Sequence, residues 1–190
     1  MNETLIDLSN ERRNKYIEIL SRKLNNDFPG EKLENGDAIY DVEVQGTTFT
    51  CCYSDNEIKA MIGYSVDILE ELRNINDDGF DRKSRNKFIK ERGKLFRDDE
   101  DLNEFFRVSE LYNKYKTDRL SRIIDEKIPD TCRVGGAWWM ILARPTIIST
   151  LDAVYEVIVD KFDDEELYIS SCYFVLRVIM HSHSVDKTVA

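Results

Sequence analysis

The strongest candidate for catalytic chemistry lies near the end of the chain, in the segment Arg177-Val-Ile-Met-His-Ser-His183. An arginine can stabilise negative charge that develops during a reaction, and a histidine can transfer a proton near neutral pH. The chain has only two histidines, His181 and His183, so imidazole chemistry would have to use this segment. Arg177 and His183 are therefore the first pair to consider as an active site.

This spacing resembles the R-x(4–6)-H motif of HEPN-type ribonucleases, helical proteins in which an arginine and a histidine from paired protomers act on RNA. The resemblance covers seven residues, and Val178 stands at a position that is usually polar in that family. It implies an RNA-processing enzyme that uses Arg177 and His183. The alternative interpretation places Arg177 on the exposed edge of the last helix, followed by a frayed polar end of the chain.

Other catalytic and metal-binding patterns are absent from the sequence. It contains no GxxxxGK[ST], no GxGxxG after a strand, no HExxH, no GxSxG and no EF-hand loop. Its four cysteines form no CxxC pair, so with two histidines a zinc site is not expected. We therefore expect no cofactor and no metal, and a non-enzymatic role is favoured over an enzyme.

Basic side chains are concentrated in residues 82–97, RKSRNKFIKERGKLFR. This segment has eight basic residues and one acid, a net charge of +7, so the rest of the chain carries −17 of the total of −10. Five of the basic residues recur at helical spacing and predict a stripe along one face: Lys83, Lys87, Lys90, Lys94 and Arg97. The stripe can contact an acidic partner protein, contact the phosphates of nucleic acid, or pair with the neighbouring acids 98–101.

The segment Thr131-Cys-Arg-Val-Gly-Gly-Ala-Trp-Trp-Met-Ile-Leu-Ala-Arg-Pro145 has both tryptophans of the chain. Residues 134–143 are uncharged and predict a central buried helix, with Pro145 separating it from the next one. Trp138 and Trp139 would point about 100° apart on such a helix. Core packing is the favoured interpretation, and a partly exposed tryptophan that anchors a partner protein is the alternative.

The elements that position these residues are mainly helical. A helix that starts at Ser9 or Asn10 has apolar side chains at helical spacing, and Pro29-Gly30 ends it. Residues 39–53 alternate between apolar and polar side chains, with Gly46 at the turn. They predict one small N-terminal β-hairpin and the only β-structure that we expect.

The remaining chain predicts further helices. Ser54-Asp-Asn-Glu57 matches a capping box, which starts a helix that ends near Asn74. Helices are then expected at about 81–97, 99–116 and 117–127. After the buried segment, the acids 163–166 begin a last helix that runs to about His181. The fold class predicted is a mainly α single domain, 1–190: a bundle of about six to eight helices with a core largely from 134–180 and a disordered tail at 184–190.

Charge and hydropathy narrow the functional classes. A net charge of −10 repels phosphates, which disfavours nucleic acid as a partner except through residues 82–97. The uncharged apolar runs reach only ten residues, short of the roughly 20 that span a bilayer, so no membrane contact is expected. The chain is expected to be cytoplasmic, or inside the host cell if it is viral.

The function favoured by the sequence is binding or inhibition of another protein by masking it, as immunity proteins, phage or viral counter-defence proteins and regulatory adaptors do. The candidate contact residues are Lys83, Lys87, Lys90, Lys94, Arg97, Trp138 and Trp139. The alternatives are the ribonuclease that uses Arg177 and His183, and a nucleic-acid-binding regulator that uses the basic segment 82–97. The sequence leaves the oligomeric state and the identity of the partner open.

Overall fold

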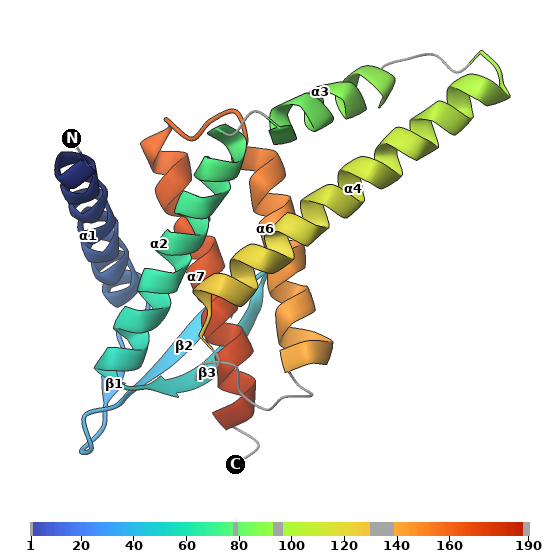
Figure 1. The fold of residues 1–190 in the computed structure, drawn as a ribbon. Coiled ribbons are helices and arrows are strands. Elements are labelled where there is room, and N and C mark those ends of the chain that lie inside the picture. Colours follow the sequence, from blue (N-terminus) through green and yellow to red (C-terminus); the bar gives the residue numbers. More distant parts are fainter. Residues whose placement is uncertain (1, 78–79, 93–96, 130–138, 188–190) are drawn as a thin grey trace.

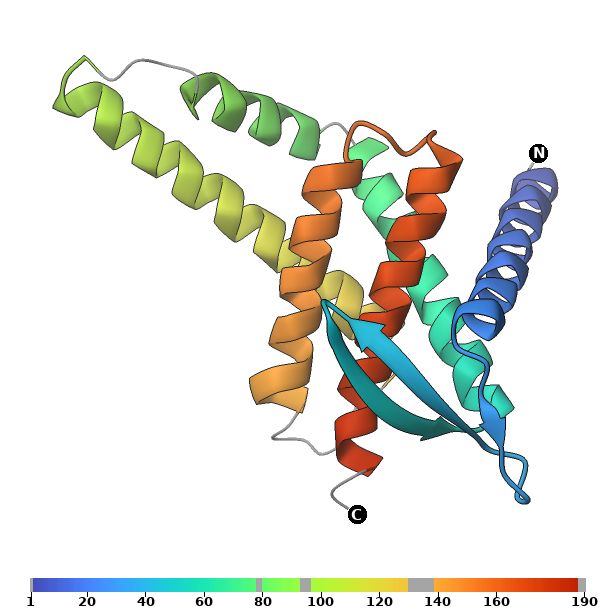
Figure 2. The ribbon, with the colours of Figure 1, turned by 180° about the vertical axis from the view of Figure 1, so that it is seen from behind.

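The fold combines a group of helices with one small sheet (Figures 1 and 2). The computed structural model describes residues 2–77, 80–92, 97–129 and 139–187, and the side chains of 9–75, 86–92, 97–129 and 139–182. These residues include six α-helices and three antiparallel strands. The predicted mainly α class, with a β-structure near the N-terminus, is therefore confirmed.

Helix α1, Asn2–Asp27, begins well before its predicted start. Ser9 and Asn10 lie inside it and are exposed. Both residues favour helix caps, but in a helix interior each costs less than about 1 kcal/mol relative to alanine, which is too little to define a start. The predicted apolar face is present, since Leu20 and Leu24 are fully buried.

The predicted hairpin consists of β2, Ala38–Val44, and β3, Thr47–Tyr53, in a register that pairs Tyr40 with Cys51 and Val44 with Thr47. Gln45 and Gly46 form the turn with φ values of 50° and 78°. Two successive positive φ values match the right-handed twist of a hairpin, and glycine adopts them without strain. The prediction of only two strands was wrong, because β1, Glu31–Lys32, pairs with the start of β2.

Helix α2, Asp55–Asp77, is central to the molecule and packs against α1, α4 and α7. Its predicted capping box is confirmed: the Glu57 carboxylate accepts from the Ser54 backbone N–H at 2.8 Å, and the Ser54 hydroxyl accepts from the Glu57 N–H at 3.2 Å. Ile62, Val66 and Leu69 are fully buried along it. The apolar side of α2 thus connects the helices around it.

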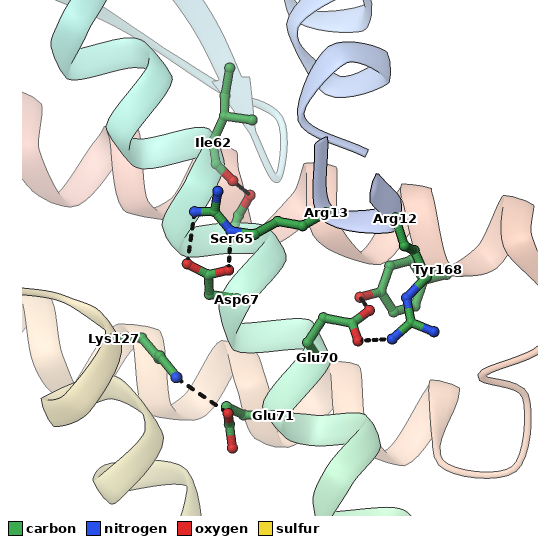
Figure 3. A network of polar contacts seen from close by, with 9 residues as sticks. All are labelled: Arg12, Arg13, Ile62, Ser65, Asp67, Glu70, Glu71, Lys127 and Tyr168. Carbon is green, nitrogen blue, oxygen red and sulfur yellow. Dashed lines mark hydrogen bonds and ion pairs between the residues drawn. The ribbon is translucent and has the colours of Figure 1, made fainter. Parts of the chain in front are cut away.

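Polar contacts fix α2 against three neighbouring helices (Figure 3). Arg13 on α1 binds Asp67 through two hydrogen bonds of 2.6 and 3.0 Å. Glu70 accepts hydrogen bonds from Arg12 on α1 and Tyr168 on α7, and Glu71 pairs with Lys127 of the fourth helix, residues 99–127, at 3.3 Å. Ion pairs of this kind contribute little when exposed but restrict helix orientation when several act together.

Helix α3, Phe80–Arg92, and helix α4, Asp99–Lys127, form an antiparallel pair. Asp98 caps α4 by accepting a hydrogen bond from the Asp101 N–H at 3.0 Å. The predicted break at residues 116–117 was wrong, because α4 is continuous there. The segment has neither glycine nor proline, and Tyr112, Leu120 and Ile124 extend one buried face across the expected junction.

The C-terminal part has a π-helical turn, η2, Trp139–Ala143, followed directly by α6, Arg144–Ile158, and then α7, Glu165–Lys187. Pro145 lies in the first turn of α6. The prediction that Pro145 separates two helices was wrong. Proline is tolerated in a first helical turn, where its missing N–H would have no intrahelical partner. α7 continues past the predicted end near His181 into the predicted tail 184–190, of which 188–190 lie outside the described residues.

The prediction of a central buried helix at 134–143 was wrong for its described part. Met140, Ile141 and Leu142 are exposed, at 62%, 70% and 46%, while Trp139 and Ala143 on either side are buried. An uncharged run shows that a segment tolerates burial, and surfaces also contain many apolar atoms. The core is also wider than 134–180, since α1, the sheet, α2 and α4 all contribute fully buried side chains.

Candidate interaction surface

The α3–α4 pair projects from the rest of the molecule as an arm in both views (Figures 1 and 2). Its inner side is held by stacked rings. The Phe88 ring lies 4.9 Å from the Tyr112 ring at 12°, and 6.4 Å from the Phe105 ring at 24°. Such offset stacks stabilise beyond the area they bury. Phe88 therefore defines the side of α3 that faces α4.

The outer side of α3 is cationic. Lys87 and Lys90 are exposed, and Ile89 between them is 47% exposed. Glu91, the one acid in the basic segment 82–97, is buried instead. The pKa of Arg107 on α4 is raised mainly by its hydrogen bonds to Glu104, and the negative charge of Glu91 adds to this effect. The negative charge of Glu91 is thus directed into the arm, while Lys90 is exposed and Lys87, one turn before Glu91, is exposed at the edge of that side.

Part of the basic stripe is paired internally. The Lys87 ammonium is 4.0 Å from the Glu104 carboxylate, at the limit of an ion pair. Arg97 is 3.3 Å from Asp101, and its side chain stays 83% exposed. The side chain of Lys83 and the whole of Lys94 lie outside the described residues. The structure therefore places Lys87, Lys90 and Arg97 on the arm's surface, with the strongest internal pairing at Arg97.

The two tryptophans proposed as contact residues are not found on the described surface. Trp139 is 6% exposed and belongs to the core, and Trp138 lies outside the described residues. Beside Trp139, the exposed side chains are Met140, Ile141 and Leu142. Sequence reasoning missed this exposed trio because the apolar run has no polar residue to mark its outer side.

Arg177 is engaged by the fold. Its guanidinium donates to the Glu43 backbone carbonyl of β2 at 2.9 Å and lies over the rings of Tyr173 and Phe174 at 5.0 and 5.8 Å. This arrangement connects α7 to the sheet. The His183 backbone belongs to α7, and its side chain lies outside the described residues.

A pocket of about 440 Å³ lies between α1, α2 and the start of α7. Its three cations already have protein partners: Lys15 pairs with Glu165 at 2.5 Å, Arg12 pairs with Glu70, and Arg73 donates to the Phe162 carbonyl at 3.3 Å. The pKa of Lys15 is raised by its hydrogen bond to Glu165. Charge compensation within the protein makes this pocket a weak candidate for an ionic ligand.

Within the described ranges, no group of three or more histidine, cysteine or acidic side chains is placed to hold a metal ion. Among the same residues, no helix has an apolar stretch long enough to cross a bilayer. Comparisons with family models, curated proteins and solved structures yielded no significant match. The function is therefore inferred from the chemistry of the surface itself.

Proposed function

We propose that the protein binds another protein, and that the outer side of α3 contacts an acidic surface of that partner. The observation that carries the proposal is the division of charge across α3. Glu91 is buried toward α4, whereas Lys90 is exposed next to Ile89, and Lys87 is exposed at the edge of α3 near Glu104 of α4. Cations around an apolar residue suit a protein interface, in which an apolar centre is surrounded by a polar rim that selects the partner by charge.

The position of α3 on a projecting arm supports the same proposal, because a partner can approach the arm without meeting the rest of the molecule (Figures 1 and 2). The rest of the chain carries a large negative charge, and a long nucleic acid would be repelled by it. A folded protein with a local acidic patch meets less of this repulsion. Binding that covers a partner's own working surface, as inhibitors and immunity proteins do, requires no catalytic group in this chain.

The experiment uses the tagged full chain to capture a partner from an extract of the organism that encodes it, followed by affinity measurement with that purified partner. The test variant is Lys87→Glu with Lys90→Glu. The control is Lys59→Glu with Lys161→Glu, two exposed lysines outside the arm that give the same change in net charge. We expect the test variant to lose affinity by about tenfold or more, chiefly through slower association, and the control to stay near wild type.

Equal affinity of the two variants would overturn the proposal. The same proteins are also incubated with a single-stranded RNA and a DNA duplex. A mobility shift that only the α3 variant loses would favour the nucleic-acid regulator instead. RNA cleavage that is lost on His183→Ala would favour the ribonuclease, and either result would replace protein binding as the conclusion.

A further inference from the structure

Strand β3 is an edge strand that carries neither a charge nor a proline. The sheet order β1-β2-β3 leaves one side of β3 without a strand partner among the described residues. Its sequence, TTFTCCY, has no charge and no proline, whereas β2 carries Asp41 and Glu43. Natural proteins protect edge strands with charges, prolines or bulges, because an exposed edge pairs readily with another strand. β3 is thus the side of the sheet that is open to pairing.

The hairpin register shows which backbone groups point outward. In a two-residue hairpin the flanking residues form a hydrogen-bonded pair, here Val44 and Thr47, and bonded and non-bonded pairs then alternate. Thr48 faces Glu43 and Thr50 faces Asp41 in non-bonded pairs. The backbone N–H and C=O groups of Thr48 and Thr50 therefore point away from β2, and both side chains are exposed to solvent.

We infer that β3 pairs antiparallel with β3 of a second copy of this chain, about a two-fold axis that passes next to Phe49. Centring the axis there places Thr48 opposite Thr50 of the other copy, and Thr50 opposite Thr48. Both of these are then hydrogen-bonded pairs, because their N–H and C=O groups already point outward. The two pairs form about four backbone hydrogen bonds.

The side chains suit this pairing. Phe49 lies opposite its own copy in a non-bonded pair, where side chains approach most closely and aromatic pairs stabilise a sheet. The Phe49 ring is already held by an edge-on contact with His181, with ring centroids 4.7 Å apart. On the other face, threonine lies opposite threonine, which is also a favourable cross-strand pair. In the symmetric dimer the Thr48–Thr50 pair occurs twice, and the Phe49 pair lies on the axis and occurs once.

The uncharged strand and its self-complementary register point to a second copy as the occupant. When a strand pairs with a copy of itself, like charges come close together and repel. Asp41 and Glu43 would therefore disfavour self-pairing of β2. The uncharged β3 has no such penalty. The interface is small, and each copy carries −10, so the dimer is expected to be weak and to strengthen as salt screens the repulsion.

The experiment measures the molecular mass of the full chain by sedimentation over a series of protein concentrations. The test variant is Thr48→Lys with Thr50→Lys. Across the interface it places lysines directly opposite lysines, while within each copy the new lysines face Glu43 and Asp41, which protects the hairpin itself. The control, Asn103→Lys with Asn113→Lys, adds the same charge at exposed positions on α4. Circular dichroism checks that all three proteins are folded.

We expect wild type and control to approach twice the chain mass as concentration rises, and the β3 variant to need at least tenfold more protein to do so. Added salt should shift the wild type toward the dimer, the opposite of its expected effect on partner binding through α3. A wild type that stays monomeric, or a β3 variant that dimerises as well as the control, overturns the inference. Neither result bears on the α3 variants, so the two proposals fail separately.

Discussion

At the scale of single residues, Lys116 on α4 is a largely buried charge that pairs with two carboxylates. Its ammonium lies 2.6 Å from Asp152 and 2.9 Å from Glu156, both on α6, and its side chain is only 11% exposed. Tyr112 donates a hydrogen bond to the same Glu156 at 2.9 Å. Burial opposes the charge of Lys116, but the hydrogen bonds to the two carboxylates outweigh it and raise the lysine pKa. One cation therefore holds two acids where the arm joins the rest of the molecule.

Replacing Lys116 by methionine should destabilise the fold by about 2 kcal/mol, because two neighbouring carboxylates lose their shared cation while the apolar stem is kept. Denaturant unfolding gives the free energy. Adding Glu156→Gln to Lys116→Met removes one of the repelling charges and should recover part of the loss. If the double variant is no more stable than the single one, the repulsion is not the cause. The matched control is Lys114→Met, since Lys114 is exposed on the same helix.

At the scale of elements, local signals with a single physical meaning were read correctly. The capping box at Ser54 and Glu57 and the glycine turn at Gly46 lie where the sequence indicates, because each depends on a few adjacent residues. The failures lay where local signals are weak. No glycine or proline marks an end at residues 116–117, and α4 continues there as one face packed on α6. The pairing of β1 with β2 involves only two residues per strand, too few to form a pattern.

The candidate surface was predictable in composition but not in direction. The basic residues of 82–97 and their helical spacing are visible in the sequence, yet which side of α3 faces outward depends on the stacking of Phe88 against Tyr112. The burial of Glu91 follows from the same packing. In η2, three exposed residues lie between two buried ones, and all five are apolar. The hydrophobicity of these residues therefore cannot indicate which of them is exposed.

The turn η2 offers a test of this assignment. Trp139→Ala should destabilise the fold by about 3–5 kcal/mol, because it leaves a large cavity in the core. Ile141→Ser, two residues away and 70% exposed, should change the free energy of unfolding by less than about 0.5 kcal/mol. Thermal or denaturant unfolding of both variants measures this contrast. Similar losses from the two substitutions would mean that Ile141 is packed as well, contrary to the described arrangement.

At the scale of the whole molecule, buried tyrosines connect segments that are far apart in the chain. The Tyr53 hydroxyl on β3 donates to the Met180 carbonyl of α7. The Tyr168 hydroxyl on α7 donates to Glu70 of α2 at 2.5 Å. Burial is the main cause that raises the pKa of both tyrosines. The second cause is the nearby Cys51 for Tyr53 and the nearby Cys172 for Tyr168. The sheet and two helices thus share contacts that require neutral phenols.

These raised pKa values predict a loss of stability in alkali. Below pH of about 10, tyrosine is neutral in both the folded and the unfolded chain, and the contribution to stability is fully present. Above it, the unfolded chain ionises Tyr53 and Tyr168 while the fold keeps them protonated. Unfolding then releases protons, and stability falls as pH rises, by about 1.4 kcal/mol per pH unit for each tyrosine.

The measurement follows tyrosinate absorbance and helical circular dichroism during the same alkaline titration. The tyrosinate absorbance of Tyr53 and Tyr168 should rise only when the helical signal is lost. Tyr53→Phe should be less stable at neutral pH by about 1 kcal/mol, because the Met180 carbonyl loses its donor, but its stability should fall less steeply above pH 10. If all nine tyrosines ionise together near pH 10 while the helices persist, burial does not hold these phenols neutral and the connections they form are not essential to the fold.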